Sequence, residues 1–599
     1  MKRINFILDH LEKYKLKLLL LVLVTVIYAG MNLISSLMLS FVIDNVIDNK
    51  PIKMTIMKML AGVLGGVENI REHLYILALV MILIYFMVMV LLRYRQSTQG
   101  VISENLVANI RNNLYHHLQE LPYAYHVKAK TGELIQKCTS DVDMIRRFFA
   151  GQFAEIFYIL ATAIIAMTIL FNINYKLAFF ASLSLPVIFL YSFLFFRKIQ
   201  KQFLVSDEAE AVMSTVIQES LSGIRVVKAF NREIYEIKKF EKTNREYYDV
   251  TYKMILSLGM YWASSYFICL LGILSIIVLG IFAVRNNAIT VGDFVVFVTY
   301  QNMILYPIRA LGRILSDFGK VTVSLDRIID ICETPGEDLI AGLKPDLRGD
   351  IVFRDVYFKY SDDNQDVLKG INLKIKKGES VALIGPTGSG KSSLVHLLSR
   401  LYDVDSGSIE INNCNINDIN NNYLRDNVGI VLQEPFLYSK SIISNLKMVN
   451  PEASDDEIYE STRIACIHDV IKSFDKGYRT LVGERGVTLS GGQKQRLAIA
   501  RTLIKKTPIL IFDDSLSAVD TQTDNMIRNE LNKIGKETTL IIITQRISSA
   551  KDCDRIFVIE DGIITESGTH DELIKIDGLY KRINEIQSQI IVKEELSNA

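Results

Sequence analysis

The sequence lacks several features that would point to common classes of protein. Its 599 residues carry a formal net charge of +1, so no overall electrostatic attraction favours nucleic-acid binding. The six cysteines are scattered without C-x-x-C spacing, which argues against a zinc site or a disulfide framework and fits a reducing cytosol. The eight histidines also lack the spacing of metal ligands. We therefore expect no nucleic-acid partner and no metal held by histidine or cysteine.

Charged residues are also missing from long stretches of the first half. Residues 18–43 contain none, which is long enough to cross a bilayer at about 1.5 Å per residue. A cleaved signal peptide would have a shorter apolar region followed by a folded exported domain, whereas further apolar stretches follow here. We predict a retained first span and five more, at residues 74–92, 156–175, 177–196, 254–284 and 291–312.

The sixth of these spans has the weakest signal. Its charge-free window, Phe294–Ile308, is short and contains Pro307, so a re-entrant segment is the alternative to a full span. Tyr300, Gln301 and Asn302 would be costly against lipid. We therefore expect this segment to line a cavity rather than face the bilayer.

Two long interruptions between the spans are rich in lysine and arginine. They cover residues 93–155 and 197–253, and the positive-inside rule places both in the cytosol. Their apolar residues recur at helical spacing, so we expect the spans to continue as helices beyond the membrane. Only the turn at 172–176 separates spans three and four, which must form a tight hairpin. We predict a six-helix, all-α membrane domain over 1–331, a linker over 332–350, an α/β domain over 351–588 and a tail over 589–599.

The second half contains a glycine-rich loop between a strand pattern and a helix pattern. An apolar run ends at Gly385, and the residues that follow fit G-x-x-x-x-G-K-[ST]. Such a loop wraps closely around phosphate oxygens with its N–H groups pointing inward. Lys391 supplies positive charge for the β- and γ-phosphates, and the Ser392 hydroxyl suits Mg²⁺. The alternative is a glycine-rich turn without a ligand. We predict that the chain binds a nucleoside triphosphate.

Two further motifs lie in the same domain. Residues 509–513 read as a buried strand ending in a carboxylate, which places Asp513 opposite Ser392 to hold Mg²⁺. Residues 489–493, LSGGQ, precede a helix, where exposed N–H groups and the Ser490 hydroxyl form a second surface for phosphate. One chain cannot fold this surface onto its own cradled nucleotide. The alternative is a plain glycine N-cap.

Together these motifs resemble those of the ATP-binding cassette (ABC) family. With six spans before one cassette, the chain resembles an exporter half-transporter of the type IV fold, an α/β P-loop domain fused to a membrane domain. The resemblance implies ATP and Mg²⁺ as cofactors, stacking of adenine on Tyr360, and Gln433 as the residue that senses Mg²⁺ and the attacking water. The implied ATP-binding residues are Tyr360, Gly385, Thr387, Gly388, Ser389, Gly390, Lys391, Ser392, Ser393, Gln433, Asp513, Ser490, Gly491, Gly492 and Gln493, and the implied Mg²⁺ ligands are Ser392, Gln433 and Asp513.

The resemblance also implies a dimer. In this family two cassettes close head-to-tail, so that each P-loop faces the other subunit's LSGGQ. Residues 131–133 with 140–143 resemble the first coupling-helix region, and residues 219–230 resemble the second. Residues 517–520 resemble the D-loop.

Two residues depart from the family pattern where ATP is hydrolysed. The family places glutamate after the Mg²⁺-binding aspartate, and this chain has Asp514; it places histidine after the next strand, and this chain has Gln545. Aspartate is one methylene shorter than glutamate, and glutamine cannot titrate. With Gln433, these are the predicted catalytic positions. The pair of changes resembles the degenerate-site subunit of a heterodimeric exporter; the alternative is neutral drift in a homodimer that tolerates aspartate.

The spans suggest a class of cargo. No Asp or Glu occurs in the charge-free windows, and aromatic and methionine side chains are frequent, which suits amphipathic or aromatic compounds, including cations that bind to π-faces. The aromatic and methionine residues considered are Trp262, Tyr266, Phe267, Tyr300, Met303 and Tyr306.

We therefore expect a multi-pass protein of a bacterial plasma membrane, in contact with lipid, whose cassette lies in the cytosol. With a different half-transporter as its partner, it would export hydrophobic or amphipathic compounds at the expense of ATP. Export of a lipid or peptide, a self-paired exporter using Asp514, a nucleotide-sensing regulator and a membrane-tethered ATPase are the alternatives.

Overall fold

The computed structural model describes residues 2–52, 55–360, 365–483, 486, 488–517, 519–533 and 537–598. The chain forms two compact units. The first comprises residues 1–119 and 130–335, and the second comprises 120–129 and 336–599.

The first unit is all-helical. Within the described residues, six helical segments are long and apolar enough to cross a membrane. They are Lys2–Ile47, Leu74–Glu120, Thr131–Ile173, Tyr175–Ser222, Glu233–Arg285 and Val291–Glu333. The labelled helices that form them include α1 (Lys2–Leu11), α2 (Lys15–Phe41), α5 (Leu74–Glu120), α7 (Thr131–Gln136), α8 (Val142–Arg147), α9 (Phe153–Ile173), α10 (Tyr175–Ser222), α12 (Glu233–Arg285) and α13 (Val291–Glu333).

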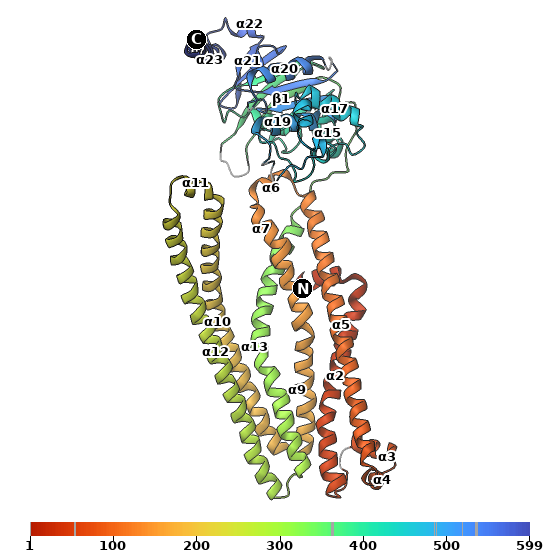
Figure 1. Ribbon diagram of the computed structural model, residues 1–599. Helices are drawn as coiled ribbons and strands as arrows, with labels where there is room; N and C mark the ends of the chain where they lie inside the picture. The colour runs from red at the N-terminus through yellow and green to blue at the C-terminus, as the bar shows by residue number, and fades with distance from the viewer. Residues whose placement is uncertain are drawn as a thin grey trace. The chain divides into compact units, whose positions relative to one another are not determined.

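The expected helical extensions and the hairpin are both confirmed. Helix α10 has 48 residues and α12 has 53, far more than a bilayer requires, and the two lie side by side in Figure 1. Asn174 separates α9 from α10, and its side chain caps α10 by accepting hydrogen bonds from the backbone N–H groups of Lys176 and Leu177, each at 3.1 Å. The short helices α3 (Thr55–Val63), α4 (Val67–Glu72) and α11 (Ile224–Ala229) complete the unit.

The sixth span is one continuous helix, so the re-entrant alternative is wrong. Helix α13 begins at a capping box formed by Thr290 and Asp293 and passes through Pro307 without a break. The prediction that this segment's polar residues line a cavity is wrong for Tyr300 and Gln301, which are fully buried, whereas Asn302 is exposed. The two buried side chains bond to neighbouring helices: the Tyr300 hydroxyl donates to the Leu33 carbonyl at 2.9 Å, and the Gln301 amide donates to Ser184 at 2.6 Å.

The second unit is an α/β domain with two sheets. The larger has the strand order β10-β9-β3-β8-β7-β6, with β10 antiparallel and the other strands parallel. The smaller has the order β2-β1-β4-β5 and is antiparallel. The strands are β1 (Ile351–Phe358), β2 (Leu368–Ile375), β3 (Ser380–Ile384), β4 (Ser406–Ile411), β5 (Cys414–Asn415), β6 (Val428–Val431), β7 (Ile509–Asp513), β8 (Thr539–Ile543), β9 (Arg555–Glu560) and β10 (Ile563–Gly568).

The central strands are apolar because helices cover both faces of a parallel sheet. Every residue of β7 and β8 is buried. The longer helices of this unit are α14 (Lys391–Leu398), α17 (Asp455–Ile464), α19 (Gly491–Leu503), α20 (Thr521–Lys533) and α23 (Leu579–Asn598), and the shorter ones include α6 (Tyr123–Lys128), α15 (Asn421–Asn427), α16 (Ile442–Leu446), α18 (His468–Lys472), α21 (Ile547–Ala550) and α22 (His570–Leu573). Helix α23 extends to Asn598, so the described part of the segment that the sequence predicts as a tail is helical.

The predicted linker packs onto the second unit. Glu337 forms an ion pair with Arg425, with N···O distances of 2.6 and 3.1 Å, and Leu347 belongs to the apolar core. The Asn420 side chain donates hydrogen bonds to three successive linker carbonyls, those of residues 339–341. From residue 336 onward the linker is therefore part of this unit.

Residues 120–129 also belong to the second unit, although they lie between the second and third spans in the sequence. The Tyr123 ring of α6 contacts the Tyr402 ring edge-on, with 5.6 Å between the centroids. The segment 131–143, which resembles a coupling region, belongs instead to the first unit, where it begins the third long helix. Residues 120–129, immediately before the predicted coupling region, are thus the ones that associate with the α/β domain.

Candidate functional site

A cleft of about 290 Å³ lies at the carboxyl end of β3, β7 and β8. Parallel α/β sheets place their ligands at this edge. The cleft is lined by Tyr360, Val367, Thr387, Gly388, Gly390, Lys391, Ser392, Ser393, Gln433, Asp513, Asp514, Ile543, Thr544 and Gln545. Eleven of these are residues that the sequence predicts for nucleotide binding or catalysis.

The glycine-rich loop adopts a conformation that requires glycine. Gly388 and Gly390 have φ values of +83° and +97°, in the left-handed region. A Cβ at Gly385 would lie 2.0 Å from the Ile559 carbonyl oxygen, so no larger residue fits. Helix α14 begins at Lys391, and its free N–H groups therefore face the cleft.

Lys391 is held over this loop. Its side chain is almost fully buried, and Nζ donates to the carbonyls of Gly385 and Pro386 at 2.9 and 2.6 Å and to the Ser389 hydroxyl at 3.2 Å. Burial lowers the pKa of Lys391, and the nearby carboxylates of Asp514 and Asp513 oppose that shift. Lys391 therefore places a positive charge at the loop.

Ser392 and Asp513 meet in the cleft. The Ser392 hydroxyl donates to Oδ1 of Asp513 at 2.9 Å. Burial raises the pKa of the Asp513 carboxyl, and the hydrogen bond from Ser392 opposes that change. A hydroxyl and a carboxylate at this separation are the oxygen ligands that Mg²⁺ prefers, so the residues present fit the metal.

Tyr360 forms one wall of the cleft. Its hydroxyl lies 2.8 Å from the Ser393 hydroxyl. Its ring packs edge-on against Phe358 and Tyr402, with centroid distances of 4.9 and 5.2 Å. These contacts fix the ring beside the glycine-rich loop, where a base can stack on it.

Gln433 lines the same cleft from the segment after β6. The residue before it is held by Gln495, a buried side chain of α19 that donates to the Leu432 carbonyl at 3.2 Å. The cleft is thus connected to the helix that follows the LSGGQ segment.

Asp514 occupies a constrained backbone position. Its φ is +46°, its N–H donates to the Ile543 carbonyl at 3.0 Å, and its carbonyl accepts from the Ser517 hydroxyl at 2.7 Å. Burial raises the pKa of the Asp514 carboxyl, the negative charge of Asp513 adds to this shift, and Arg546 and Lys391 oppose it. Since the main chain is fixed at both ends of the residue, the reach of the carboxylate depends on side-chain length.

Gln545 follows β8 and also lines the cleft. Its side-chain amide donates to the Thr387 hydroxyl at 3.3 Å. Its main chain is held by Gln587 of α23, whose amide donates to the Gln545 carbonyl at 2.7 Å and whose oxygen accepts from the Ile547 N–H at 2.9 Å. Sequence reasoning missed Gln587, because no local pattern connects a residue 42 positions away to this loop.

Arg546 was also missed. Its guanidinium donates to the carbonyls of Ser517 and Val519 at 2.7 and 3.3 Å, which fixes the described residues on either side of Ala518. Ala518, part of the predicted D-loop, lies outside the described residues. Arg546 thus couples the loop after β8 to the loop after β7.

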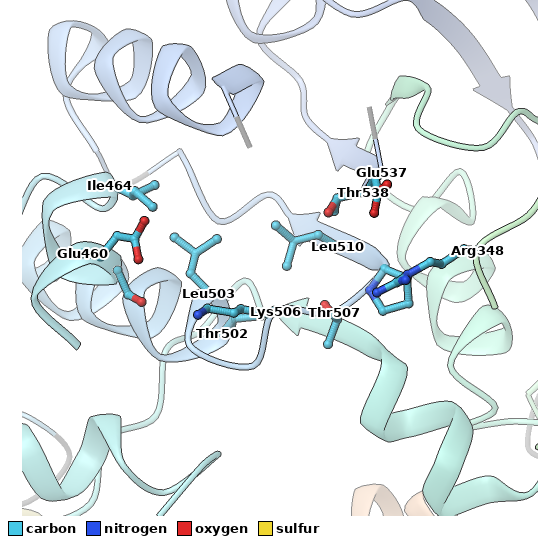
Figure 2. Close-up of a pocket in the computed structure, with 12 residues that line it drawn as sticks. Arg348, Glu460, Ile464, Thr502, Leu503, Lys506, Thr507, Leu510, Glu537 and Thr538 are labelled. Atoms are coloured by element: carbon cyan, nitrogen blue, oxygen red, sulfur yellow. The ribbon is translucent and has the colours of Figure 1, made fainter. Parts of the chain in front are cut away.

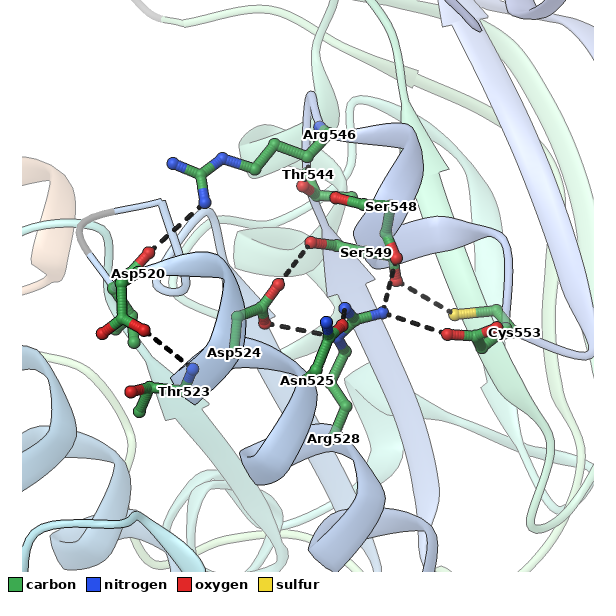
Figure 3. Close-up of polar contacts among 12 residues, drawn as sticks. Asp520, Thr523, Asp524, Asn525, Arg528, Thr544, Arg546, Ser548, Ser549 and Cys553 are labelled. Carbon is green, nitrogen blue, oxygen red and sulfur yellow. Dashed lines mark hydrogen bonds and ion pairs between the residues drawn. The ribbon is translucent and has the colours of Figure 1, made fainter. Parts of the chain in front are cut away.

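A buried network joins the helices behind these loops. Arg528 and Asp524 of α20 form an ion pair at 3.2 Å, and Asp524 also accepts from the Ser549 hydroxyl of α21 at 3.0 Å (Figure 3). Arg528 in turn donates to the Ser548 carbonyl at 2.7 Å. The network therefore connects the helix after β7 to the helix after β8.

Replacing Arg528 with leucine is expected to destabilise the α/β domain by about 3–5 kcal/mol, because the buried Asp524 carboxylate would lose its ionic partner. This corresponds to a fall in melting temperature on the order of 10 °C for a domain of this size. Lys533→Leu is the control, since Lys533 forms only an exposed pair with Glu530 on the same helix. Differential scanning calorimetry of the full-length proteins measures the melting temperatures of both variants. Equal melting temperatures for Arg528→Leu and the control would contradict the prediction.

The LSGGQ residues lie outside the cleft. Ser490 and Gln493 form a capping box at the start of α19: the Ser490 hydroxyl accepts from the Gln493 N–H at 3.3 Å, and the Gln493 side chain accepts from the Ser490 N–H at 2.9 Å. Ser490, Gly491, Gly492 and Gln493 are absent from the residues that line the cleft. Within this chain they therefore face no nucleotide of its own.

A second cavity of the α/β domain, of about 300 Å³, contains none of the motif residues (Figure 2). It lies among α17, the end of α19 and the start of β7. Lys506 at its rim forms an ion pair with Glu457 at 2.8 Å, which holds the pKa of that carboxyl at about 2. Its charged groups include both signs, so it has no bias toward one class of ion.

Comparison with known sequences identifies both halves. The family described as the ABC transporter transmembrane region matches residues 18–308, and the family described as ABC transporter matches residues 368–517. A Bacillus subtilis protein described as a candidate multidrug export ATP-binding/permease protein (YgaD) is 31% identical over 97% of this chain and 98% of its own length. The chain belongs to the ABC transporter family.

Other relatives agree with this assignment. An uncharacterised ABC transporter ATP-binding protein of Bacillus subtilis (YknU) is 36% identical over 80% of this ABC transporter and 83% of its own length. Among solved structures, a bacterial Atm1-family ABC exporter with ATP bound has a TM-score of 0.78 and 25% identity, and the match covers 96% of this chain and 98% of the other. The protein is a type IV ABC half-transporter, multi-pass in the membrane and with a cytosolic ATP-binding domain.

Proposed function

We propose that this half-transporter pairs with a different one to export hydrophobic or amphipathic compounds across a bacterial plasma membrane, and that its own ATP site hydrolyses slowly. One observation carries the proposal. The cleft has a complete set of residues for gripping ATP, yet Asp514 and Gln545 occupy the two positions where the family resemblance places glutamate and histidine.

The ATP-binding residues of the cleft would contact different parts of the nucleotide. Tyr360 would stack on the base, and the N–H groups of the loop and the N-terminus of α14 would receive the phosphates. Lys391 would add a positive charge at the terminal phosphates. Mg²⁺, when bound, neutralises phosphate charge, and Ser392, Asp513 and Gln433 would hold it.

Hydrolysis requires a carboxylate close to the attacking water. The side chain of Asp514 is shorter than that of glutamate by one methylene, and a misplacement of about 1 Å can cost on the order of 10²-fold in rate. The main chain cannot advance to compensate, because Asp514 is tied to Ile543 and Ser517 on either side. This site should therefore hold ATP for much longer than a site with the glutamate and the histidine takes to hydrolyse it.

Gln545 weakens the site further. Its amide points to Thr387 in the glycine-rich loop and can donate a hydrogen bond to a terminal phosphate. It carries no charge and cannot exchange a proton near neutral pH, as an imidazole can. Gln545 would thus keep the binding contact and lose the contribution to phosphate charge in the transition state.

The LSGGQ surface gives this chain its role in the pair. The capping box holds Ser490 and the N–H groups of α19 in place, although nothing in this chain's own cleft uses them. In a head-to-tail pair they would complete the partner's ATP site, and the partner would supply the glutamate and the histidine.

A self-paired exporter that tolerates Asp514 is the second candidate, and export of a lipid or peptide remains open for either assembly. A regulator or tethered ATPase would show no cargo-stimulated hydrolysis. ATP-dependent uptake of cargo into inside-out vesicles containing the purified pair would establish transport, and its absence would refute it.

Expressed and purified alone, the chain is expected to hydrolyse ATP on the order of 10²-fold more slowly than the pair, because each of its sites would have Asp514. Steady-state phosphate release from detergent-purified protein measures this. Brisk hydrolysis by a dimer of identical chains would instead favour the self-paired exporter.

A further inference from the structure

Arg309 of α13 lies between two aromatic rings in the membrane unit. The centre of its guanidinium is 4.7 Å from the ring of Trp262, on α12, and 5.1 Å from the ring of Tyr306. The Tyr306 ring in turn packs near that of Tyr266, with 6.0 Å between the centroids. Two aromatic side chains thus flank a positive charge that belongs to the protein itself.

The guanidinium has no acid partner in the part of the chain that the structure describes. The ion pairs found there do not include Arg309, and its buried Nε has no hydrogen-bond acceptor. The nearby Tyr261 hydroxyl is committed to other groups: it donates to the main-chain carbonyl of Arg309 at 2.9 Å and lies 2.9 Å from the Ser192 hydroxyl. The Nε of Arg309 is thus a buried donor without an acceptor.

Arg95 provides an internal comparison. It too lies over two aromatic rings, those of Tyr28 and Tyr158, at 5.7 and 5.3 Å. It also forms an ion pair with Glu155 at 2.7 Å. The two arginines therefore share an aromatic setting and a buried Nε without an acceptor, and what Arg309 lacks is the carboxylate.

Arg309 lies near the far end of the sixth span. It lies 18 residues beyond Val291, the first residue of α13, or about 27 Å along a straight helix, and a hydrocarbon core is about 30 Å thick. A charge at that level lies near the edge of the hydrocarbon, and ionisable residues within spans usually contact a bound group or line a pathway. A ligand with a negative charge would supply the missing partner.

We propose that Arg309 binds the anionic group of an amphipathic cargo, a carboxylate, phosphate or sulfonate, whose apolar body contacts Trp262, Tyr266 and Tyr306. The proposal rests on the export function and narrows its cargo to amphipathic anions. It also replaces the expectation of cation binding at these rings, because the guanidinium already covers the faces of Trp262 and Tyr306 and repels a second cation. A lipid headgroup phosphate has the same chemistry.

The lone tryptophan of the sequence, Trp262, reports directly on this site. The full chain is reconstituted in phosphatidylcholine vesicles and titrated with pyrenebutyrate, pyrenebutanol or pyrenebutyl-trimethylammonium, which share one apolar body and differ in charge. Pyrene absorbs tryptophan emission, so quenching of Trp262 gives an apparent Kd. We expect the carboxylate probe to bind most tightly and Arg309→Gln to weaken it by about tenfold to a hundredfold, with the other two probes unchanged.

Arg313→Gln is the matched control, since it removes the same charge from an exposed position one turn along α13. An unchanged Kd for Arg309→Gln, an equal loss in both variants, or tighter binding of the ammonium probe would overturn the proposal. Arg309→Lys keeps the charge and should recover part of the affinity, which separates binding from misfolding. Adding phosphatidylglycerol to the vesicles distinguishes a lipid headgroup from a free amphipathic anion as the ligand. If the lipid displaces the probe from the wild type but not from Arg309→Gln, the anion is a lipid headgroup.

The quenching assay needs neither ATP nor the partner chain. Loss of the anion preference with intact ATP-driven uptake would therefore refute this inference alone. Intact quenching without uptake would refute the export function alone.

Discussion

Replacing Asp514 with glutamate and Gln545 with histidine is expected to raise ATP hydrolysis at this chain's site by about 10²-fold. Glutamate extends the carboxylate by one methylene from a main chain that is fixed by Ile543 and Ser517. Histidine restores a group that can carry charge beside the terminal phosphate. The measurement is phosphate release by the assembled pair in which the partner's own P-loop lysine is replaced with alanine, so that only the altered site turns over.

The single variants act as controls for this gain. Asp514→Glu alone should recover most of it, because the carboxylate positions the water, and Gln545→His alone should recover little. A double variant that hydrolyses no faster than the unaltered pair would contradict the geometric account of the slow site, provided that the partner's LSGGQ-equivalent segment is intact.

Gly491→Asp is expected to reduce ATP hydrolysis by the unaltered pair about 10²-fold or more, because it would place a negative charge against the phosphates of the partner's nucleotide. The chain itself should tolerate the change. A Cβ at Gly491 meets no atom within 4 Å, and aspartate is favourable in the first turn of α19. The loss should therefore appear in hydrolysis and not in the stability of this chain.

Lys391→Ala tests this chain's own ATP site, whereas Gly491→Asp tests the partner's. It should abolish photolabelling of this chain by an ATP analogue, since Lys391 holds the glycine-rich loop and its charge, yet lower the pair's hydrolysis only a few-fold. If Lys391→Ala removed as much hydrolysis as Gly491→Asp, the two sites would contribute equally and the asymmetric pair would be refuted.

Local patterns were sufficient to predict much of this protein. Charge-free stretches predicted six spans because a bilayer excludes charge whatever its neighbours are, and the described part of the chain has six helical segments of that kind. The spacing of Gly385, Gly388, Gly390 and Lys391 predicted the strand–loop–helix that forms one side of the cleft, because the backbone conformation there requires glycine. Asp513 and Asp514 followed from their place at the end of an apolar strand.

Other features depend on contacts between residues far apart in the sequence. The polar residues of the sixth span left a re-entrant segment as an alternative. Only packing showed that the Tyr300 hydroxyl and the Gln301 amide NH₂ donate to residues of α2 and α10. Likewise, nothing local placed residues 120–129 with the α/β domain.

The sequence alone determined the two domains, the ATP-gripping loop and the two atypical residues at Asp514 and Gln545, because each is encoded within one short segment. The tertiary structure alone decided that Gln587 and Arg546 hold the loops after β7 and β8. It also decided which arginine of the membrane unit has an acidic partner. Arg95 and Arg309 look alike in the sequence; they differ because Glu155, 60 residues along the chain, folds back onto only one of them.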